Sequence, residues 1–396
     1  MSVTLLPDPR AALAIVPFQA WPRDSSLAET LASGVARDLS GLATWLSVTA
    51  VAATISGPAD LRHLRKTRRV RFVLHGSVEA ERNVVRLLVE LNEAETGRVL
   101  WSNRFDGARE RLASLHDSAI SRIAEVVPQT IHQWEQDRLA LVPVEARTPH
   151  ELALCAFARI MRPVRPHFAA ARDLLALAEA RGGAESSIWL TRAWWHVMNL
   201  AQGWSEDDPA ELAAATSAIR QANDDDPAVR ALTAWLGVLG RGDLSGALAL
   251  LEEVLEAAPL CSLACSLKAL VLVGQNAFDD ALLYAERAEV LAVLGPERAW
   301  RAQVMAFCHY LCGQYAAAAR WARASAAHHP GLVDTMCVLA ASLVMLGRLD
   351  EATRAAQQVM NIQPGFRISG WQRRLVLPEA AQAHYAQRLR LAGLPA

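Results

Sequence analysis

Hydrophobic and polar residues alternate almost without interruption between residues 71 and 101, in the stretch RFVLHGSVEAERNVVRLLVELNEAETGRVLW. An alternation with a period of two is typical of strands that bury one face. Charged residues, Asn and Gly interrupt it near residues 81–83 and 95–97, where they favour turns. The stretch therefore predicts three strands joined by two hairpin turns.

Shorter apolar patterns surround these three strands. They predict strands at residues 13–18 and 45–51 and helices at residues 27–39, 59–69 and 111–139. The resulting order is βαβαβββα over residues 11–140. Such an order indicates an α+β domain with a mixed sheet, in which helices cover one face of the sheet.

From about residue 150 onward, Ala and Leu become frequent, and Gly and Pro recur at regular intervals. The repeated stretches include GDLSGALALLEEVLEAAP and GRLDEATRAAQQVMNIQP. Four alanines in register are spaced by 34, 37 and 34 residues: Ala247, Ala281, Ala318 and Ala352. This period predicts units of two amphipathic helices, with a proline after the second helix. Because no unit can bury its apolar face alone, the units are expected to stack into an all-α superhelix.

This repeat resembles the tetratricopeptide (TPR) family. About six units are expected between residues 148 and 366, followed by a C-terminal capping helix and tail over residues 367–396. Arrays of this kind bind partners on the concave face that the first helices form. The positions expected on that face are Leu232, Leu236, Leu239, Leu270, Val273, Phe307, Tyr310 and Val344. They lack the Lys, Asn and Arg residues that clamp a peptide carboxylate in chaperone-binding members.

An apolar concave face favours a protein partner that presents a helix or an extended peptide. The chain's own tail and a second copy, as a homodimer, are alternative occupants, and packing between repeats is an alternative role for several of these positions. A candidate hot spot is a group of tryptophans, because Trp often anchors interfaces. It consists of Trp189, Trp194, Trp195 and Trp204, for which packing within the repeat is the alternative.

The N-terminal stretches AIVPF, VRFVLHGSV and NVVRLLVELNEAETGRVLWSNRFD resemble the TolB amino-terminal-like domain. That domain is fused to TPR repeats, downstream of class III adenylate cyclase domains or of winged-helix DNA-binding domains, so the resemblance covers about residues 11–366. It implies an output to signalling or transcriptional regulation. This chain departs from the pattern at His75, where the family has a glutamate. The residues before Ala11 carry neither a winged-helix motif nor cyclase metal-binding aspartates.

The net charge of the 396 residues is −1, so composition gives no general attraction to nucleic acid or to an anionic membrane. One basic stretch contains Arg62, Arg65, Lys66, Arg68 and Arg69. A nucleic-acid or phosphate patch is one interpretation. We favour a solvated helix face, because no aromatic residues interleave the charges to stack on bases. No run approaches the roughly 18 apolar residues of a membrane span, which predicts a cytoplasmic protein with no membrane partner.

The sequence contains no phosphate-binding glycine loop and no H-E-x-x-H, G-x-S-x-G or C-x-x-C motif. The pairs Cys261/Cys265 and Cys308/Cys312 are spaced i, i+4, yet a zinc site needs four ligands and cysteine packs well in cores. We therefore expect no catalytic residues, no metal and no cofactor.

Together these patterns predict a non-catalytic bacterial regulatory scaffold for signal transduction. It would bind a protein partner through its repeats and use the TolB-like domain for docking or sensing. The alternatives are a transcriptional regulator that contacts DNA through residues 62–71 and an accessory part of an adenylate cyclase system. The identity of the partner and the oligomeric state do not follow from the sequence.

Overall fold

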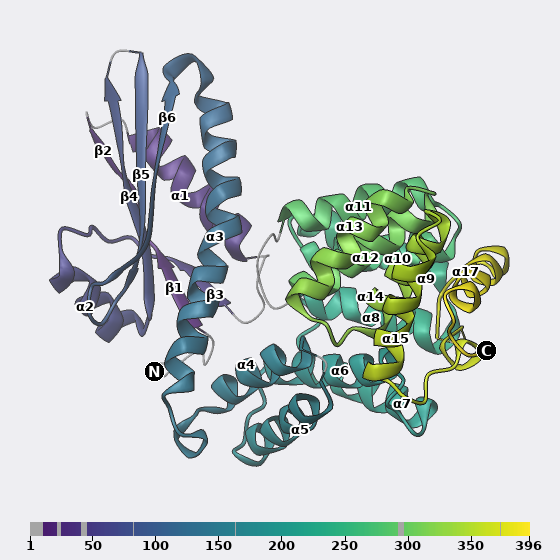
Figure 1. The fold of residues 1–396 in the computed structure, drawn as a ribbon. Coiled ribbons are helices and arrows are strands. Elements are labelled where there is room, and N and C mark those ends of the chain that lie inside the picture. The colour runs from purple at the N-terminus through teal and green to yellow at the C-terminus, as the bar shows by residue number, and fades with distance from the viewer. Residues whose placement is uncertain are drawn as a thin grey trace. The chain divides into compact units, whose positions relative to one another are not determined.

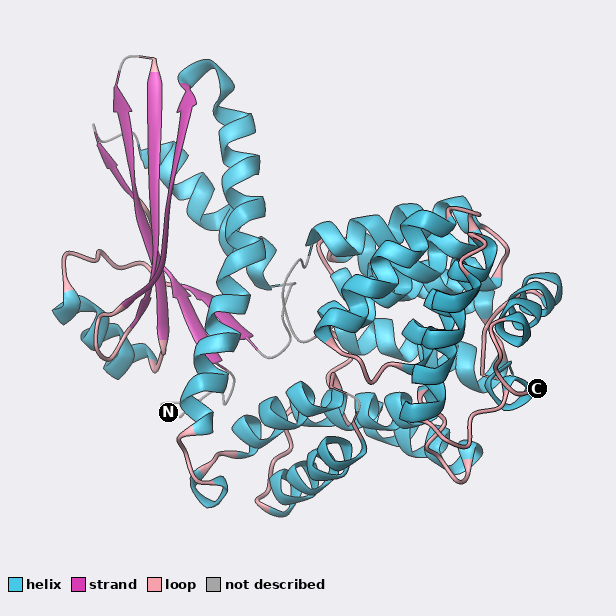
Figure 2. Cartoon of the chain, in the orientation of Figure 1, coloured by secondary structure: helices cyan, strands magenta, loops and turns pink. Residues whose placement is uncertain are grey.

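The computed structural model describes residues 11–21, 25–40, 46–81, 83–162, 164–291, 297–372 and 374–396. The chain forms two compact units, Met1–His150 and Glu151–Ala396, which we call the N-terminal unit and the helical array. Their elements are labelled in Figure 1, and Figure 2 distinguishes the strands of the first unit from the helices of the second. The predicted fold class, a mixed-sheet α+β domain followed by an all-α array, is confirmed.

The N-terminal unit is built on one mixed sheet. Its strands are β1 (Ala11–Ile15), β2 (Gln19–Trp21), β3 (Leu46–Ala50), β4 (Phe72–Glu81), β5 (Val84–Glu93) and β6 (Val99–Ala108). Its helices are α1 (Ser25–Ser40), α2 (Pro58–Arg68) and α3 (Leu112–Ala140), with short helical turns η1 (Arg109–Arg111) and η2 (Val144–Ala146). The strand order is β3-β1-β4-β5-β6, and β2 pairs with β4. β1 runs parallel to β3 and β4, whereas β4, β5 and β6 are antiparallel.

Strand β2 was not predicted, because three residues are too few to show an alternation. It runs parallel to β4 and pairs Gln19 with Ser77 and Trp21 with Glu79. The structure therefore divides the predicted strand at residues 13–18: its first residues belong to β1, and the rest connect β1 to β2. Trp45, where the next strand was expected to begin, lies outside the described residues.

One face of the sheet is covered by α1 and α3 (Figure 1). Because alternate residues of a strand point to the same face, β4 and β5 bury every second side chain there. The buried strand residues include Phe72, Leu74, Val78, Val85, Leu87, Val89 and Leu91. They pack in one cluster with Leu39 of α1 and with Ile123 and Ile131 of α3. This core accounts for the alternation between residues 71 and 101.

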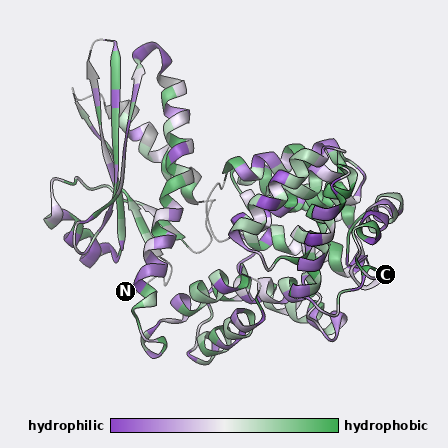
Figure 3. Cartoon of the chain, viewed as in Figure 1, coloured by the Kyte–Doolittle hydropathy of each residue, from purple (hydrophilic) through white to green (hydrophobic). Residues whose placement is uncertain are grey.

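The opposite face is covered in part by α2, which corrects the expectation that helices cover one face of the sheet. Leu61 and Leu64 of α2 are buried with Val73 of β4. The rest of this helix is polar, and Figure 3 colours it mostly as hydrophilic. Elsewhere on this face, Arg86 lies between Glu79 and Asp106 in the cross-strand register.

The helical array contains six helix pairs among its described residues. They are α4 (Pro149–Ile160) with α5 (Arg165–Ala180), α6 (Ser186–Ala201) with α7 (Asp208–Ile219), α8 (Pro227–Arg241) with α9 (Leu244–Ala257), α10 (Ser262–Gly274) with α11 (Phe278–Leu291), α12 (Arg298–Leu311) with α13 (Tyr315–His328), and α14 (Val333–Met345) with α15 (Leu349–Ile362). Within the described residues, every helix is too short or too polar to cross a bilayer.

The recurring glycines have a backbone reason. In five successive pairs, a residue one or two positions after the end of the first helix has a φ between 63° and 72°: Gly203, Gly242, Asn276, Gly313 and Gly347. This left-handed conformation suits glycine, and asparagine tolerates it better than most other residues. The recurring alanines lie on the second helices and are at most 3% exposed, including Ala247, Ala281, Ala318 and Ala352. Their small side chains allow the helices to pack closely.

The chain continues beyond the sixth pair with α16 (Ile368–Gln372) and α17 (Glu379–Leu391). α17 packs on α14, the first helix of the last pair. Tyr385 and Leu389 of α17 are fully buried in the same cluster as Cys337. The backbone N–H of Ile368 donates a hydrogen bond to the carbonyl of Pro395 at 2.9 Å. The last residues are therefore held against the array.

Candidate functional site

A cavity of about 670 Å³ lies within the helical array. Side chains from the first helices of five successive pairs line it: α6, α8, α10, α12 and α14. Four tryptophans contribute to its walls, namely Trp194, Trp235, Trp300 and Trp371. Trp194 and Trp300 touch edge to face, with ring centroids 5.7 Å apart. The cavity is therefore mainly apolar and aromatic, and it follows the face that the first helices form.

The tail closes part of this groove. Residues 374–378, which we call the tail segment, have no regular secondary structure and connect α16 to α17. Val376 packs with the apolar cluster that includes residues of α8 and α10. A Cβ atom placed on Gly274 of α10 would lie 2.9 Å from Cγ1 of Val376. Arg374, Leu375 and Val376 all line the cavity. The groove is thus partly occupied by the chain itself, and a cavity remains.

Polar side chains gather among the residues that line the cavity. Asp334 accepts hydrogen bonds from Trp371 Nε1 at 2.5 Å and from Gln303 Nε2 at 3.4 Å. Burial raises the pKa of Asp334, while the hydrogen bond from Trp371 and the charge of Arg374 oppose this rise. Within the described residues, three neighbouring polar atoms have no hydrogen-bond partner: Gln303 Oε1, Arg374 Nε and the Tyr385 hydroxyl. Tyr385 is 0% exposed, and burial raises its pKa well above the usual range.

Half of the positions expected on the concave face line this cavity. They are Leu239, Leu270, Val273 and Phe307. Leu232 and Leu236 are instead buried within the array, and Val344 packs in the cluster around α14 and α17. Tyr310 is also buried, with its ring 4.8 Å from that of Tyr385. Val344 and Tyr310 do not line the cavity because α17 packs over this end of the first helices. The role of all eight in partner binding stays a prediction.

The four candidate hot-spot tryptophans do not form one site. Trp194 lines the cavity, whereas Trp195 stacks on Phe168 with ring centroids 4.8 Å apart and donates to its carbonyl oxygen. Trp204 meets Phe168 edge to face at 5.1 Å and carries the guanidinium of Arg165 over its ring at 5.3 Å. Trp189 is partly buried on α6. Packing thus accounts for Trp195 and Trp204.

Sequence reasoning missed several lining residues. Trp300 and Gln303 lie two turns and one turn before Phe307 on α12, and their spacing could have placed them on the same face. Trp371 and Tyr385 lie beyond the repeats, where no periodic pattern indicates which face they approach. Asp334 is an acidic residue in the first turn of α14, and it resembles an ordinary helix-start residue until Trp371 is placed beside it.

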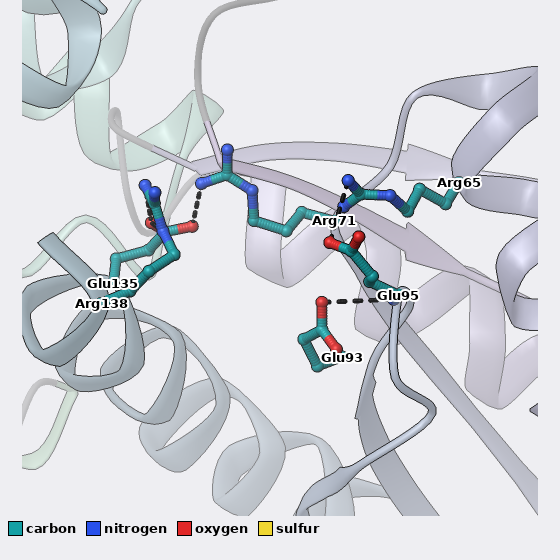
Figure 4. Close-up of polar contacts among 6 residues, drawn as sticks. All are labelled: Arg65, Arg71, Glu93, Glu95, Glu135 and Arg138. Carbon is teal, nitrogen blue, oxygen red and sulfur yellow. Dashed lines mark hydrogen bonds and ion pairs between the residues drawn. The ribbon is translucent and has the colours of Figure 1, made fainter. Parts of the chain in front are cut away.

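Some side chains of the basic stretch form ion pairs within the N-terminal unit (Figure 4). Arg65 pairs with Glu95 at 2.9 Å. Arg71 bonds to the buried carboxylate of Glu135, which also accepts from Arg138 at 2.8 Å. The remaining basic side chains of α2 and its end are exposed and have no ion-pair partner in the described part of the chain: Arg62, Lys66, Arg68 and Arg69.

The cysteines are free thiols. Burial raises the pKa of Cys261 to about 12 and that of Cys265 to about 11, which makes both thiols poor nucleophiles. Cys308 is fully buried, and Cys312 donates to the carbonyl of Phe278. The described residues contain no cluster of three or more His, Cys, Asp or Glu side chains placed to hold a metal ion. The cysteine pairs therefore serve helix packing.

Comparison with known proteins gives partial likenesses. No family model matches the chain. It is 25% identical over 135 residues to a protein of Rhizobium meliloti (strain 1021) named "Putative adenylate cyclase 3", which covers 33% of this chain and 23% of that protein. The chain thus spans less than a quarter of the length of this curated relative.

Among solved structures, the chain is similar to TTC0263, a thermophilic TPR protein in Thermus thermophilus, with 18% identity and a TM-score of 0.35. That match covers 49% of this chain and 99% of that one. It is also similar to YrrB, a TPR protein with an unusual peptide-binding site, with 18% identity and a TM-score of 0.32 over 45% of this chain and 89% of that one. A third likeness is to the PelC dodecamer from Paraburkholderia phytofirmans, with 22% identity and a TM-score of 0.23 over 29% of this chain and 86% of that one.

Proposed function

We propose that this protein is a non-catalytic regulatory scaffold, which binds a protein partner in the groove of its helical array. One observation carries the proposal: the groove holds a non-helical stretch of the chain itself, the tail segment, with Val376 packed against α10. The lining of this groove is mainly apolar, with aromatic anchors of the kind that dominate binding energy at interfaces. A surface that packs apolar side chains of one non-helical segment has the chemistry to pack those of another.

The N-terminal unit would act as the docking or sensing module. The resemblance of its strands to the TolB-like domain, and the partial likeness to a protein named as an adenylate cyclase, favour a role in signalling. The sheet face on the side of α2 offers a surface for such docking, since one cross-strand row there places Arg86 between Glu79 and Asp106. A separate cyclase or DNA-binding protein would then supply the output.

Site-specific photo-crosslinking tests the groove. A benzophenone side chain replaces Leu239, which lines the groove, or Leu283, which is 60% exposed on α11 and does not line it. Both proteins are made in the organism that produces the chain and are irradiated there. We expect a discrete intermolecular adduct from position 239, no such adduct from position 283, and loss of the adduct when Leu270→Gln is added.

Identical adducts from both positions, or none from position 239 in a folded protein, would contradict a partner in the groove. Circular dichroism of each variant separates a lost contact from a lost fold. Mass spectrometry of the adduct also distinguishes a second copy of this chain from a different protein. A second copy would retain the groove as a binding site but change the scaffold into a homodimer.

DNA binding is a second candidate, supported by the exposed cations of α2 that have no ion-pair partner among the described residues. A DNA contact through them predicts affinity that falls steeply with salt and that is lost in the variant Arg62→Glu, Lys66→Glu, Arg69→Glu. Arg65 is left unchanged, because it already pairs with Glu95. Equal weak binding by the variant and the parent at low salt would exclude this role.

A further inference from the structure

We propose that the cavity in the helical array binds a small, electrically neutral and largely apolar molecule that carries one hydrogen-bonding group. This goes beyond the scaffold function, which concerns a protein partner. The volume of about 670 Å³ falls within the range of about 300 to 1,000 Å³ that small-molecule sites occupy. Such sites combine apolar and aromatic walls with a few polar groups that orient the ligand.

With the tail segment in place, the cavity that remains has the size of a small-molecule site. Residues of the tail segment already form one wall, because Leu375 and Val376 line the cavity and Val376 packs against α10. Trp371 and Tyr385, on either side of that segment, form another part of the lining, with ring centroids 5.0 Å apart. A peptide as long as the groove would have to displace this segment, whereas a compact molecule fits while the tail stays in place.

Three residues of the lining carry buried polar atoms without a partner within the described residues, and we place the hydrogen-bonding group of the ligand beside them. The Tyr385 hydroxyl and Gln303 Oε1 are buried and have no partner within the described residues, although both residues line the cavity. Arg374 Nε is a third such atom on the same lining. Buried polar groups are nearly always hydrogen-bonded in folded proteins. A ligand group that can both donate and accept, such as a hydroxyl or an amide, would bond to these atoms, and an aryl N–H group would supply the donor alone.

The charges in the site favour a neutral ligand. Asp334 and Arg374 both line the cavity and carry opposite charges, so neither a cation nor an anion gains a net attraction. Both oxygens of Asp334 already accept hydrogen bonds from protein donors, Trp371 and Gln303. The remaining lining is dominated by tryptophan and aliphatic side chains, which stabilise an apolar body by burying its surface.

Two probes of nearly the same shape test this inference. N-phenylnaphthylamine is neutral and apolar and has one N–H group, whereas anilinonaphthalene sulfonate adds a negative charge to the same ring system. Each probe is excited directly, and its fluorescence is recorded while increasing amounts of the full chain are added. We expect saturable one-site binding of the neutral probe and at least tenfold weaker binding of the sulfonate.

Variants locate the probe. Leu239→Trp and Leu270→Trp each fill part of the cavity from a partly buried position. We expect each to reduce the affinity for the neutral probe at least tenfold. Leu283→Trp, on the outer side of α11, makes the same type of change without touching the cavity and should leave the affinity unchanged. Tyr385→Phe keeps the ring and removes the hydroxyl, and a loss of about threefold to tenfold is expected for one hydrogen bond.

Non-saturable binding, equal binding of both probes, or affinity that neither cavity-filling variant reduces overturns the inference. Circular dichroism and thermal melting show whether each variant is folded, and the use of two filling positions guards against the failure of one. The crosslinking test at position 239 is independent of these titrations, since it records a protein adduct. The scaffold function and the ligand site can therefore fail separately.

Discussion

Two polar sites of this protein, one in each unit, differ in how their polar groups are satisfied. In the N-terminal unit, buried charge is matched: Glu135 lies between Arg71 and Arg138 and is 1% exposed. In the helical array, Gln303, Arg374 and Tyr385 line a cavity, and each has a buried polar atom without a partner among the described residues. A network in which every polar group has a partner contributes to stability. Polar groups without a partner beside a cavity are instead groups that a ligand would satisfy. The array is therefore where we expect recognition.

Glycines are required in this protein for two different reasons. Strands β4 and β5 come so near at Gly76 that an added Cβ would lie 2.3 Å from the carbonyl oxygen of Leu88. In the array, by contrast, Gly242, Gly313 and Gly347 have no atom within 4 Å of such a Cβ, and they are required by their positive φ. A substitution at Gly76 consequently acts through a steric clash, whereas one at Gly242, Gly313 or Gly347 acts through backbone strain.

Gly76→Ala should have the largest effect on stability. The new methyl group meets backbone in the middle of the sheet, so strands β4 and β5 must separate or shift register. We expect a loss of about 3 kcal/mol in the free energy of unfolding. Urea unfolding followed by near-ultraviolet circular dichroism measures it. The matched control in the same unit is Gly57→Ala, where nothing lies within 4 Å, and a loss above about 1 kcal/mol there would undermine the steric explanation.

Glu135→Gln tests the matched charges of the N-terminal unit. The amide keeps the size of the side chain but leaves Arg71 and Arg138 without their shared carboxylate. Breaking a fully buried pair costs about 3–5 kcal/mol, but both arginines are partly exposed, so we expect about 2 kcal/mol. The measurement is urea unfolding in low and high salt. A loss below about 0.5 kcal/mol would show that the network contributes little beyond packing.

The array provides a pH-dependent contrast at His329. Burial and the nearby charges of Arg162 and His328 lower the pKa of His329 to about 4. Because the unfolded chain binds a proton near pH 6.5 and the folded chain does so only near pH 4, stability is present above pH 6.5 and falls as the pH decreases between these values. Allowing for partial exposure, we expect a loss of about 1 kcal/mol from this group. His329→Gln should remove that part of the acid sensitivity in melts recorded from pH 7 to pH 4, and an unchanged profile would contradict the assignment.

Much of this architecture follows from local pattern. The alternation at residues 71–101 fixes which side chains of β4 and β5 enter the core, and the repeated alanines identify the second helices because their small side chains are needed at every helix contact. Tertiary placement does not follow in the same way. Nothing in the polar sequence of α2 reveals that Leu61 and Leu64 face the second side of the sheet. The cavity depends on Trp371, Arg374 and Tyr385, which lie outside any repeat, so its polar groups could not be assigned from periodicity.

Arg65→Gln should have the smallest effect, and it sharpens the comparison between matched charges that are buried and exposed. Arg65 pairs with Glu95 at 2.9 Å, but the two side chains are 40% and 61% exposed. Solvent screens such a pair, and holding two long side chains in place costs conformational entropy, so we expect a change below about 0.5 kcal/mol. Urea unfolding beside Glu135→Gln measures both pairs in one fold. A loss at Arg65 as large as that at Glu135 would show that these charges act as one network across the unit, and burial would then no longer explain the difference.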